Sequence, residues 1–428
     1  MADTNQPLPK QLSPIVCTGC SLVCDDILLN REGQNITFDN VCSKGEQHLR
    51  HRRNSAANVF EIDGQSFDAS KSESAFEAAL ANAATKAAAI LSNARQPLVA
   101  GIEHLGTATQ QMAVSVAMRA GAIVDSELDN GGRASLFSLQ RVGRSTATLG
   151  EVRKRADLVV FWFCDPSDSH PRLVESFCSG PGQEIISING DVKTAPDVAQ
   201  VCEMLLRGIT VSADQIPAGV ELSECQSLVE KLKSKNYAAF FFDPQKFDPC
   251  FDSAIDALSS LISQLNSKTR AVALPIRSAA NQSAANEHSA ENVLAWSTGF
   301  AAAVSTSRNN RSHFLEYSAA QVLKNKECDA ALLFAGSHDS AKWIAKQTSS
   351  LPTIVVSESV HALENKRRGG GNESLQLTGD LLAGKNDWCR MDDVLIPLGQ
   401  DRSHQQSATS WVYRFLQLTR EQLAQRMQ

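Results

Sequence analysis

The stretch CTGCSLVC at residues 17–24 decides how this chain is organised, together with one cysteine further on. It places Cys17, Cys20 and Cys24 with two and then three residues between them, and Cys42 follows alone. Thiolates that converge on one small volume are soft ligands, suited to an iron–sulfur cluster or to zinc. Zinc sites more often show two well-separated Cys-x2-Cys pairs, so this spacing favours a [4Fe–4S] cluster. Zinc, or a set of cysteines that holds nothing, remain the alternatives, because buried cysteine without a ligand is common.

The composition excludes several classes of protein. A chain of 428 residues is too long for one core, so two or three domains are expected. The net charge of −6 argues against a general nucleic-acid binder, which needs a basic face. The sequence shows neither an apolar run of the ~18 to 20 residues that cross a membrane nor the pattern of a signal peptide. Because an odd count of 11 cysteines suits a reducing compartment, we expect a cytoplasmic protein without nucleic-acid or membrane partners.

Beyond the cysteines the chain alternates between apolar strands and helices. Residues up to about 62 indicate a loop-rich module whose small core a metal centre would support. The segment Ser74–Glu77 fits a capping box and predicts the start of a long helix. The apolar face expected for this helix carries Phe76, Leu80, Ala84, Ala87 and Leu91. Apolar runs at 98–102, 157–163, 238–242 and 330–335, with helical patterns between them, predict buried parallel strands. The expected fold class is therefore α/β, doubly wound, with at least two sheets.

Other candidate residues are histidines and basic stretches. Arg50–Arg53 and Asn365–Asn372, which includes Arg367 and Arg368, could contact an anion, although a solvated surface run is the simpler interpretation of each. Five histidines lie near predicted strand or helix ends, where sites of α/β proteins tend to form. His170, beside Pro171 and Arg172, is the first of them to test. The five are His104, His170, His288, His338 and His361.

Several segments resemble a known family. Cys-x2-Cys-x3-Cys leading into α/β units resembles the N-terminal part of the molybdopterin and tungstopterin oxidoreductases, and the closer resemblance is to the B subunit of formylmethanofuran dehydrogenase. The most specific segment is TLGEV at 148–152, followed by RAD at 155–157. The segments that carry the resemblance, between about residues 15 and 400, are 17–27, 146–152, 155–162, 165–172, 292–299 and 390–392.

The resemblance implies a molybdopterin oxidoreductase-like fold in three parts. These are an iron–sulfur module at 1–62, a discontinuous α/β domain at 63–150 plus 325–428, and a Rossmann-like domain inserted at 151–324. In the dehydrogenases this subunit holds tungsten or molybdenum between two pterins and interconverts carbon dioxide and formate. A separate amidohydrolase subunit then condenses formate with methanofuran.

The chain departs from the dehydrogenases at their metal ligand. Those enzymes carry Cys or selenocysteine, followed by His, in the loop before the segment that matches 146–152. Here that loop reads DNGGRASLF at 129–137, and no cysteine lies between Cys42 and Cys164. Ser135 offers only an oxygen, whereas this redox chemistry uses a soft ligand, so we expect no tungsto- or molybdopterin. Arg133 could hold a carboxylate in this loop or replace the lost positive charge.

The resemblance therefore implies the B subunit of a formyltransferase/hydrolase complex in tetrahydromethanopterin-linked one-carbon metabolism. In that complex a formyl group passes to a methanofuran-type carrier and is hydrolysed to formate on the A subunit. This chain is then expected to be a non-redox scaffold without catalytic residues of its own, with the A, C and D subunits as partners and with a contact to the carrier. The alternatives are an active dehydrogenase subunit with an oxygen ligand on its metal, and an iron–sulfur redox sensor or electron carrier.

Overall fold

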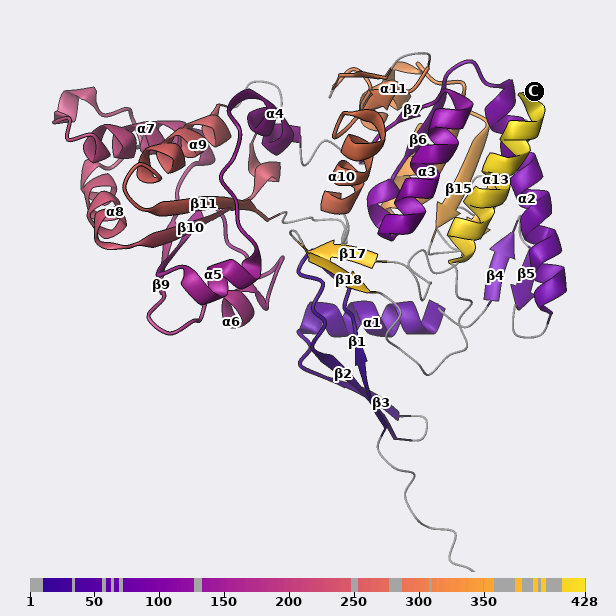
Figure 1. Ribbon diagram of the computed structural model, residues 1–428, viewed down its shortest axis with the longest axis horizontal. Helices are drawn as coiled ribbons and strands as arrows, with labels where there is room; N and C mark the ends of the chain where they lie inside the picture. Colours follow the sequence, from indigo (N-terminus) through magenta and orange to yellow (C-terminus); the bar gives the residue numbers. More distant parts are fainter. Residues whose placement is uncertain are drawn as a thin grey trace, which may run out of the picture. The chain divides into compact units, whose positions relative to one another are not determined.

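The computed structural model divides the chain into two compact units (Figure 1). The split unit comprises Met1–Asp129 and Ala280–Gln428, and the inserted unit is Asn130–Ala279. The residues described are 11–32, 35–55, 59–62, 65–68, 72–126, 133–247, 253–276, 287–307, 310–313, 315–336, 338–348, 350–357, 374–378, 388–391, 394–397 and 410–427. None of the helices in these ranges is long and apolar enough to cross a membrane.

The split unit begins with a small antiparallel sheet in the order β1-β2-β3, followed by helix α1. Strands β2 and β3 pair antiparallel, with Leu29 opposite Phe38. The core that these elements share is small and consists of Ile15, Cys17, Ile27, Leu29 and Leu49. We call residues 11–55 the cysteine module. Its elements are β1 (Gln11–Ile15), β2 (Ile27–Glu32), β3 (Asn35–Asp39) and α1 (Ser43–Ser55).

A second, larger sheet forms the centre of the split unit, in the order β13-β12-β7-β6-β14-β15-β16-β4-β5. Strands β7, β6, β14, β15 and β16 are parallel, and the outer strands pair antiparallel. The strands are β4 (Val59–Ile62), β5 (Gln65–Asp68), β6 (Pro97–Ala100), β7 (Ile123–Val124), β12 (Val304–Ser305), β13 (Arg311–Ser312), β14 (Ala330–Ala335), β15 (Thr353–Ser357) and β16 (Ser374–Thr378). A separate hairpin joins β17 (Trp388–Met391) and β18 (Val394–Pro397).

Helix α2 shows both a correct and an incorrect prediction. Its expected apolar positions, among them Phe76, Leu80 and Leu91, are buried. The capping box at Ser74 is wrong, because the helix begins earlier and Ser72 Oγ accepts from Ala75 N–H at 3.4 Å. The other helices of this unit include α3 and α13, which pack together. The set is α2 (Glu73–Asn93), α3 (Thr107–Ala120), α10 (Glu287–Thr298), α11 (Ala319–Asn325), α12 (His338–Gln347) and α13 (Trp411–Arg426).

The inserted unit has one parallel sheet in the order β11-β10-β8-β9. All residues of β8 and β10 are buried, as expected for central strands covered on both faces. The α/β fold class is therefore confirmed. The elements are α4 (Arg133–Val142), α5 (Leu149–Arg155), β8 (Leu158–Trp162), α6 (Leu173–Phe177), β9 (Glu184–Ile188), α7 (Ala195–Leu206), α8 (Leu222–Ser234), β10 (Tyr237–Phe242), α9 (Ala254–Leu265) and β11 (Arg270–Pro275).

The limits of the inserted unit differ from the expected 151–324. The unit starts at Asn130 because α4 packs against α9 of the same unit. It stops at Ala279 because the chain then returns to the larger sheet, where Val304 of β12 lies opposite Val124 of β7. Local periodicity shows where a helix or strand lies, but not which sheet it joins.

Candidate metal centre

Cys17, Cys20 and Cys24 lie on one compact loop between β1 and β2. Cys17 N–H donates to Cys24 O at 2.9 Å, and Val23 N–H donates to Cys20 O at 3.2 Å. Val23 has a φ of 47° and a fully buried side chain. Because a β-branched residue is strained in the left-handed region, the loop conformation must be held by its surroundings.

Cys42 precedes α1 and approaches this loop from the helix. Its Sγ accepts from Gly45 N–H at 3.3 Å, and Cys17 Sγ accepts in the same way from Gly19 N–H at 3.4 Å. Hydrogen bonds from backbone N–H groups to sulfur stabilise the negative charge of a ligating thiolate. The two sulfurs therefore have surroundings that suit metal ligation.

Gly45 lies close to both of these sulfurs. A Cβ at this position would lie 3.1 Å from Cys17 Sγ and 3.4 Å from Cys42 Sγ. The structure thus brings Cys17 and Cys42 to the same side of α1. Cys20 and Cys24 are half-buried. Backbone hydrogen bonds within the loop join Cys24 to Cys17 and Cys20 to Val23.

A [4Fe–4S] cluster and a zinc ion place different demands on the four cysteines. No group of three or more His, Cys, Asp or Glu side chains within the described ranges is arranged to hold a metal ion. Zinc needs four ligands at about 2.0–2.3 Å from one point. A [4Fe–4S] cluster binds each thiolate through a different iron atom, so its four sulfurs lie further apart. Four thiols are a soft donor set that suits either group, so the choice between cluster and zinc stays a prediction.

The segment that corresponds to the metal loop of the dehydrogenases opens the inserted unit. Residues 129–132 fall outside the described residues, and α4 begins at Arg133, whose side chain is fully buried. Ser135 is also buried, and its Oγ accepts from Arg144 Nη1 at 2.5 Å. A metal could use this oxygen only after that charge-assisted hydrogen bond had broken.

The predicted histidines fall into different surroundings. His170 is 2% exposed, and its Nδ1 lies 2.9 Å from Ser169 Oγ. His104 is 9% exposed, and its Nε2 lies 3.7 Å from Glu103 Oε1. His288 and His338 lie in α10 and α12, where their side chains are not described, and His361 lies outside the described residues. A catalytic role for any of them stays a prediction.

The buried Glu103–His104 pair lies at the switch point of the larger sheet, where ligands of doubly wound proteins usually bind. Strand β6 has β7 on one side and β14 on the other. The turn after β6 lies against the end of β14, since a Cβ on Gly336 would be 2.5 Å from His104 Nδ1. The chain's own imidazole therefore fills space at this switch point. Sequence reasoning noted His104 but missed Glu103, although both follow an apolar strand.

The inserted sheet has its own switch point between β8 and β10. Cys164 Sγ donates to Phe241 O at 3.2 Å, and Lys246 Nζ donates to Phe163 O at 3.1 Å. Burial, followed by the negative charge of Asp243, raises the pKa of the Cys164 thiol to about 12. This thiol is therefore protonated near pH 7 and is not a nucleophile.

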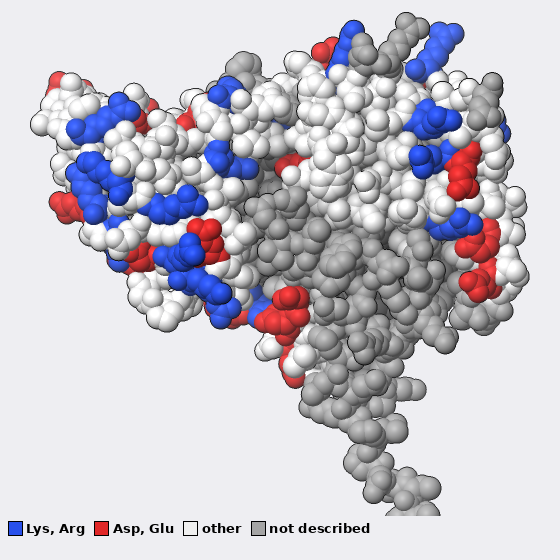
Figure 2. Space-filling model, in the orientation of Figure 1, with Lys and Arg blue, Asp and Glu red and all other residues white. Residues whose placement is uncertain are grey.

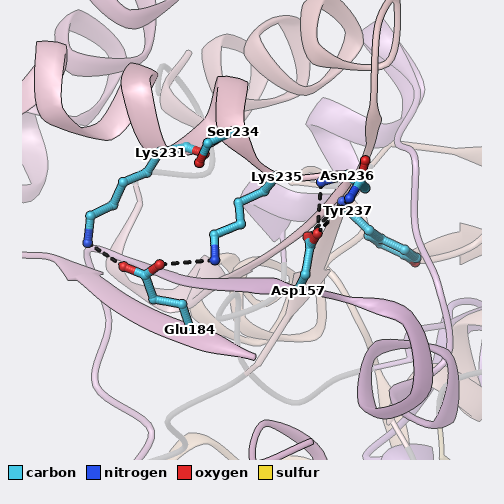
Figure 3. Close-up of polar contacts among 7 residues, drawn as sticks. All are labelled: Asp157, Glu184, Lys231, Ser234, Lys235, Asn236 and Tyr237. Carbon is cyan, nitrogen blue, oxygen red and sulfur yellow. Dashed lines mark hydrogen bonds and ion pairs between the residues drawn. The ribbon is translucent and has the colours of Figure 1, made fainter. Parts of the chain in front are cut away.

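The opposite, amino-terminal edge of the inserted sheet carries a structural charge network (Figure 3). Asp157 accepts from Asn236 N–H at 2.9 Å and from Tyr237 N–H at 2.8 Å, which ties the start of β8 to the start of β10. Lys231 of α8 and Lys235, which directly follows that helix, both bind Glu184 at the start of β9. These contacts hold strands and a helix together, and the groups that make them are engaged with one another.

The most specific matching segments also have structural roles. Thr148 is the N-cap of α5, and its Oγ1 accepts from Glu151 N–H at 3.1 Å. Glu151 in turn accepts from Tyr237 OH at 2.9 Å. The segment TLGEV and the following Asp157 therefore build the scaffold rather than a reaction site.

Charged side chains of both signs lie interspersed on the face drawn in Figure 2. Of the predicted basic stretch on α1, Arg50 binds Glu46 at 2.7 Å and lies over the Phe38 ring at 5.6 Å. The side chains of 51–53 and the stretch 365–372 fall outside the described residues. Arg50 is therefore already engaged within its own module.

Comparison with known proteins shows first which solved structures have a fold similar to that of this chain. No family model matches the chain. Among solved structures it is similar to a chain of the formyltransferase/hydrolase complex (FhcABCD) from Methylorubrum extorquens, determined with methylofuran. The TM-score is 0.63 and the identity 20%, covering 81% of this chain and 97% of that chain. This likeness shows the fold.

Two curated relatives show which proteins the chain resembles in sequence. The chain is 24% identical over 378 residues to the B subunit of the tungsten-containing formylmethanofuran dehydrogenase 2 of Methanocaldococcus jannaschii, covering 81% of this chain and 84% of the relative. It is 25% identical over 321 residues to the protein of the same name from Methanococcus maripaludis, covering 69% and 72%. The resemblance predicted from the sequence motifs is thus confirmed.

Proposed function

We propose that this chain is the B subunit of a formyltransferase/hydrolase complex and acts there as a non-redox scaffold. Its partners are the A, C and D subunits of that complex, and a methanofuran-type carrier contacts the assembly. Formyl transfer and hydrolysis need no electron transfer, so they place no demand on a redox metal in this chain.

One observation carries the proposal. The curated relatives are named as tungsten-containing enzymes, yet this chain has no cysteine between Cys42 and Cys164. Ser135 carries the hydroxyl that could replace such a cysteine as a metal ligand. This hydroxyl accepts a hydrogen bond from Arg144. The larger sheet gives further support, because His104 fills space at the switch point, where a doubly wound sheet would receive a ligand.

We also propose that Cys17, Cys20, Cys24 and Cys42 hold a [4Fe–4S] cluster, with zinc or an empty set of cysteines as the alternatives. Such a cluster supplies covalent cross-links between the loop and α1 and, where its potential allows, one-electron transfer. The N–H groups of Gly19 and Gly45 support this assignment because they already donate to two of the sulfurs.

The test is anaerobic purification of the complex that contains this chain. We expect formyl transfer and release of formate, no oxidation of formate with a dye acceptor, and about four iron atoms per chain with neither tungsten nor molybdenum. Tungsten or molybdenum near one per chain, together with dye reduction, would overturn the scaffold role.

The second candidate is an active tungsten or molybdenum formylmethanofuran dehydrogenase subunit, which the names of the curated relatives favour. It requires bound pterin in the purified protein. An Arg133→Ala variant is informative for both candidates: normal assembly and turnover would remove any role of this buried guanidinium at the former metal loop.

A further inference from the structure

His48 of α1 contacts the cysteine loop directly. Its Nε2 lies 2.9 Å from Thr18 Oγ1, and a Cβ on Gly19 would lie 3.3 Å from His48 Cβ. Gly19 is the residue whose N–H donates to Cys17 Sγ. His48 therefore contacts the two residues that lie between Cys17 and Cys20.

The same face of α1 also carries Gly45. Residues three apart on a helix lie side by side, so Gly45 and His48 both face the loop, Gly45 beside two sulfurs and His48 beside Thr18. The hydroxyl-bearing side chain of Thr18 is 1% exposed. Because a buried hydroxyl is costly without a hydrogen bond, its contact with His48 favours one position of the loop.

We propose that the Thr18–His48 hydrogen bond is a latch that holds the Cys17–Cys20 loop in its ligating conformation. His48 is then a positioning residue and not a ligand, since the ring nitrogen that reaches the loop is engaged by Thr18. The proposal rests on the cluster assigned under the proposed function. It adds that retention of the cluster depends on a side chain outside the four cysteines.

The test uses pairs of variants that differ only in the hydrogen bond. His48→Gln keeps a polar group near the position of Nε2, and His48→Leu has similar bulk without one. Thr18→Ser keeps the hydroxyl, and Thr18→Val replaces it with a methyl group. The full chain is reconstituted anaerobically with ferrous iron and sulfide, and the decay of its visible absorption in air is followed together with iron content.

We expect His48→Leu and Thr18→Val to lose the cluster about fivefold faster than the wild type, a factor typical of one hydrogen bond. His48→Gln and Thr18→Ser should stay within about twofold. The double variant Thr18→Val/His48→Leu should be no worse than either single variant, because both remove the same bond. His313→Leu, at a side chain that is 58% exposed, is the control and should match the wild type.

Equal decay for His48→Leu and His48→Gln would overturn the latch, and so would full additivity in the double variant. If the wild type takes up no iron, the cluster assignment fails separately. The latch is then read in the metal-free chain from the rates at which iodoacetamide alkylates Cys17 and Cys20, located by mass spectrometry. His48→Leu should again be faster than His48→Gln, and equal rates would overturn the proposal.

Discussion

The cysteine module and the inserted unit are stabilised in different ways. The module packs five buried residues, one of which is the predicted ligand Cys17. The inserted unit packs β8 and β10 between helices, with Trp162, Phe240 and Phe242 fully buried. Since a small core supplies little stability, the proposed metal centre would supply to the module what the inserted unit obtains from hydrophobic burial. The comparison therefore predicts that removal of the proposed ligands affects the module and spares the inserted unit.

Removal of the metal ligands should produce the largest difference between the two regions. In the double variant Cys17→Ser/Cys42→Ser, backbone amides of the module should lose protection from hydrogen exchange by at least about tenfold, because ligand binding and folding are linked there. Amides of β8 and β10 should keep their protection. Mass spectrometry of the exchanged chain measures both at once. Unchanged protection of the module would mean that its own core suffices.

A core substitution in the inserted unit should have the converse effect. Phe240 is fully buried, with its ring centroid 6.0 Å from that of Trp162. Phe240→Ala should cost about 3–5 kcal/mol of unfolding free energy, measured by urea denaturation, and should leave iron content unchanged. Ile185→Ala, at a side chain that is 39% exposed, is the control and should stay within about 0.5 kcal/mol. Loss of iron in Phe240→Ala would contradict the independence of the two regions.

Asp157 gives the inserted unit a smaller and pH-dependent contribution. Burial raises its pKa, but hydrogen bonds from Asn236 and Tyr237 outweigh this and lower the pKa below its usual value. The carboxylate therefore stabilises the folded state fully above about pH 4, the usual pKa in unfolded chains, and this contribution disappears as pH falls through the lower folded pKa. Asp157→Asn should cost about 0.5–1 kcal/mol at pH 7, because water screens this partly exposed carboxylate, and it should cost less at pH 3.

Urea midpoints of the wild type and Asp157→Asn at the two pH values measure this difference. A gap between them that stays constant from pH 7 to pH 3 would show that the carboxylate charge does not contribute.

The smallest effect is expected at Glu184. Hydrogen bonds from Lys231, then Lys235, lower the pKa of its carboxyl group, but all three side chains are partly exposed. Exposed ion pairs contribute little because water and salt screen them. Glu184→Gln should leave the urea midpoint unchanged within error. A clear loss of stability would show that β9 depends on this pair.

The sequence allowed a correct prediction of the α/β class, most strands and the buried face of α2, because these follow from local periodicity. It also located the cysteine loop. The N-cap was misassigned because Ser72 and Ser74 are the same type of residue, which suits an N-cap at either position. Only the extended backbone conformation of Ser72 shows that the helix begins after it. His48 was missed, since nothing in its adjacent residues indicates that Thr18 lies beside it. Glu103 was missed although it precedes His104 directly in the sequence.

The amino-acid sequence by itself determined the alternation of strands and helices, the four candidate thiolate ligands and the absence of cysteine between Cys42 and Cys164. These depend on residue types and spacings along the chain. Only the tertiary structure decided that Gly45 lies close to two sulfurs, that His48 reaches Thr18, and that the inserted unit runs from Asn130 to Ala279. Each of these depends on contacts between residues distant in sequence. Such contacts form only once each strand has joined a sheet and each helix has packed against one face of it.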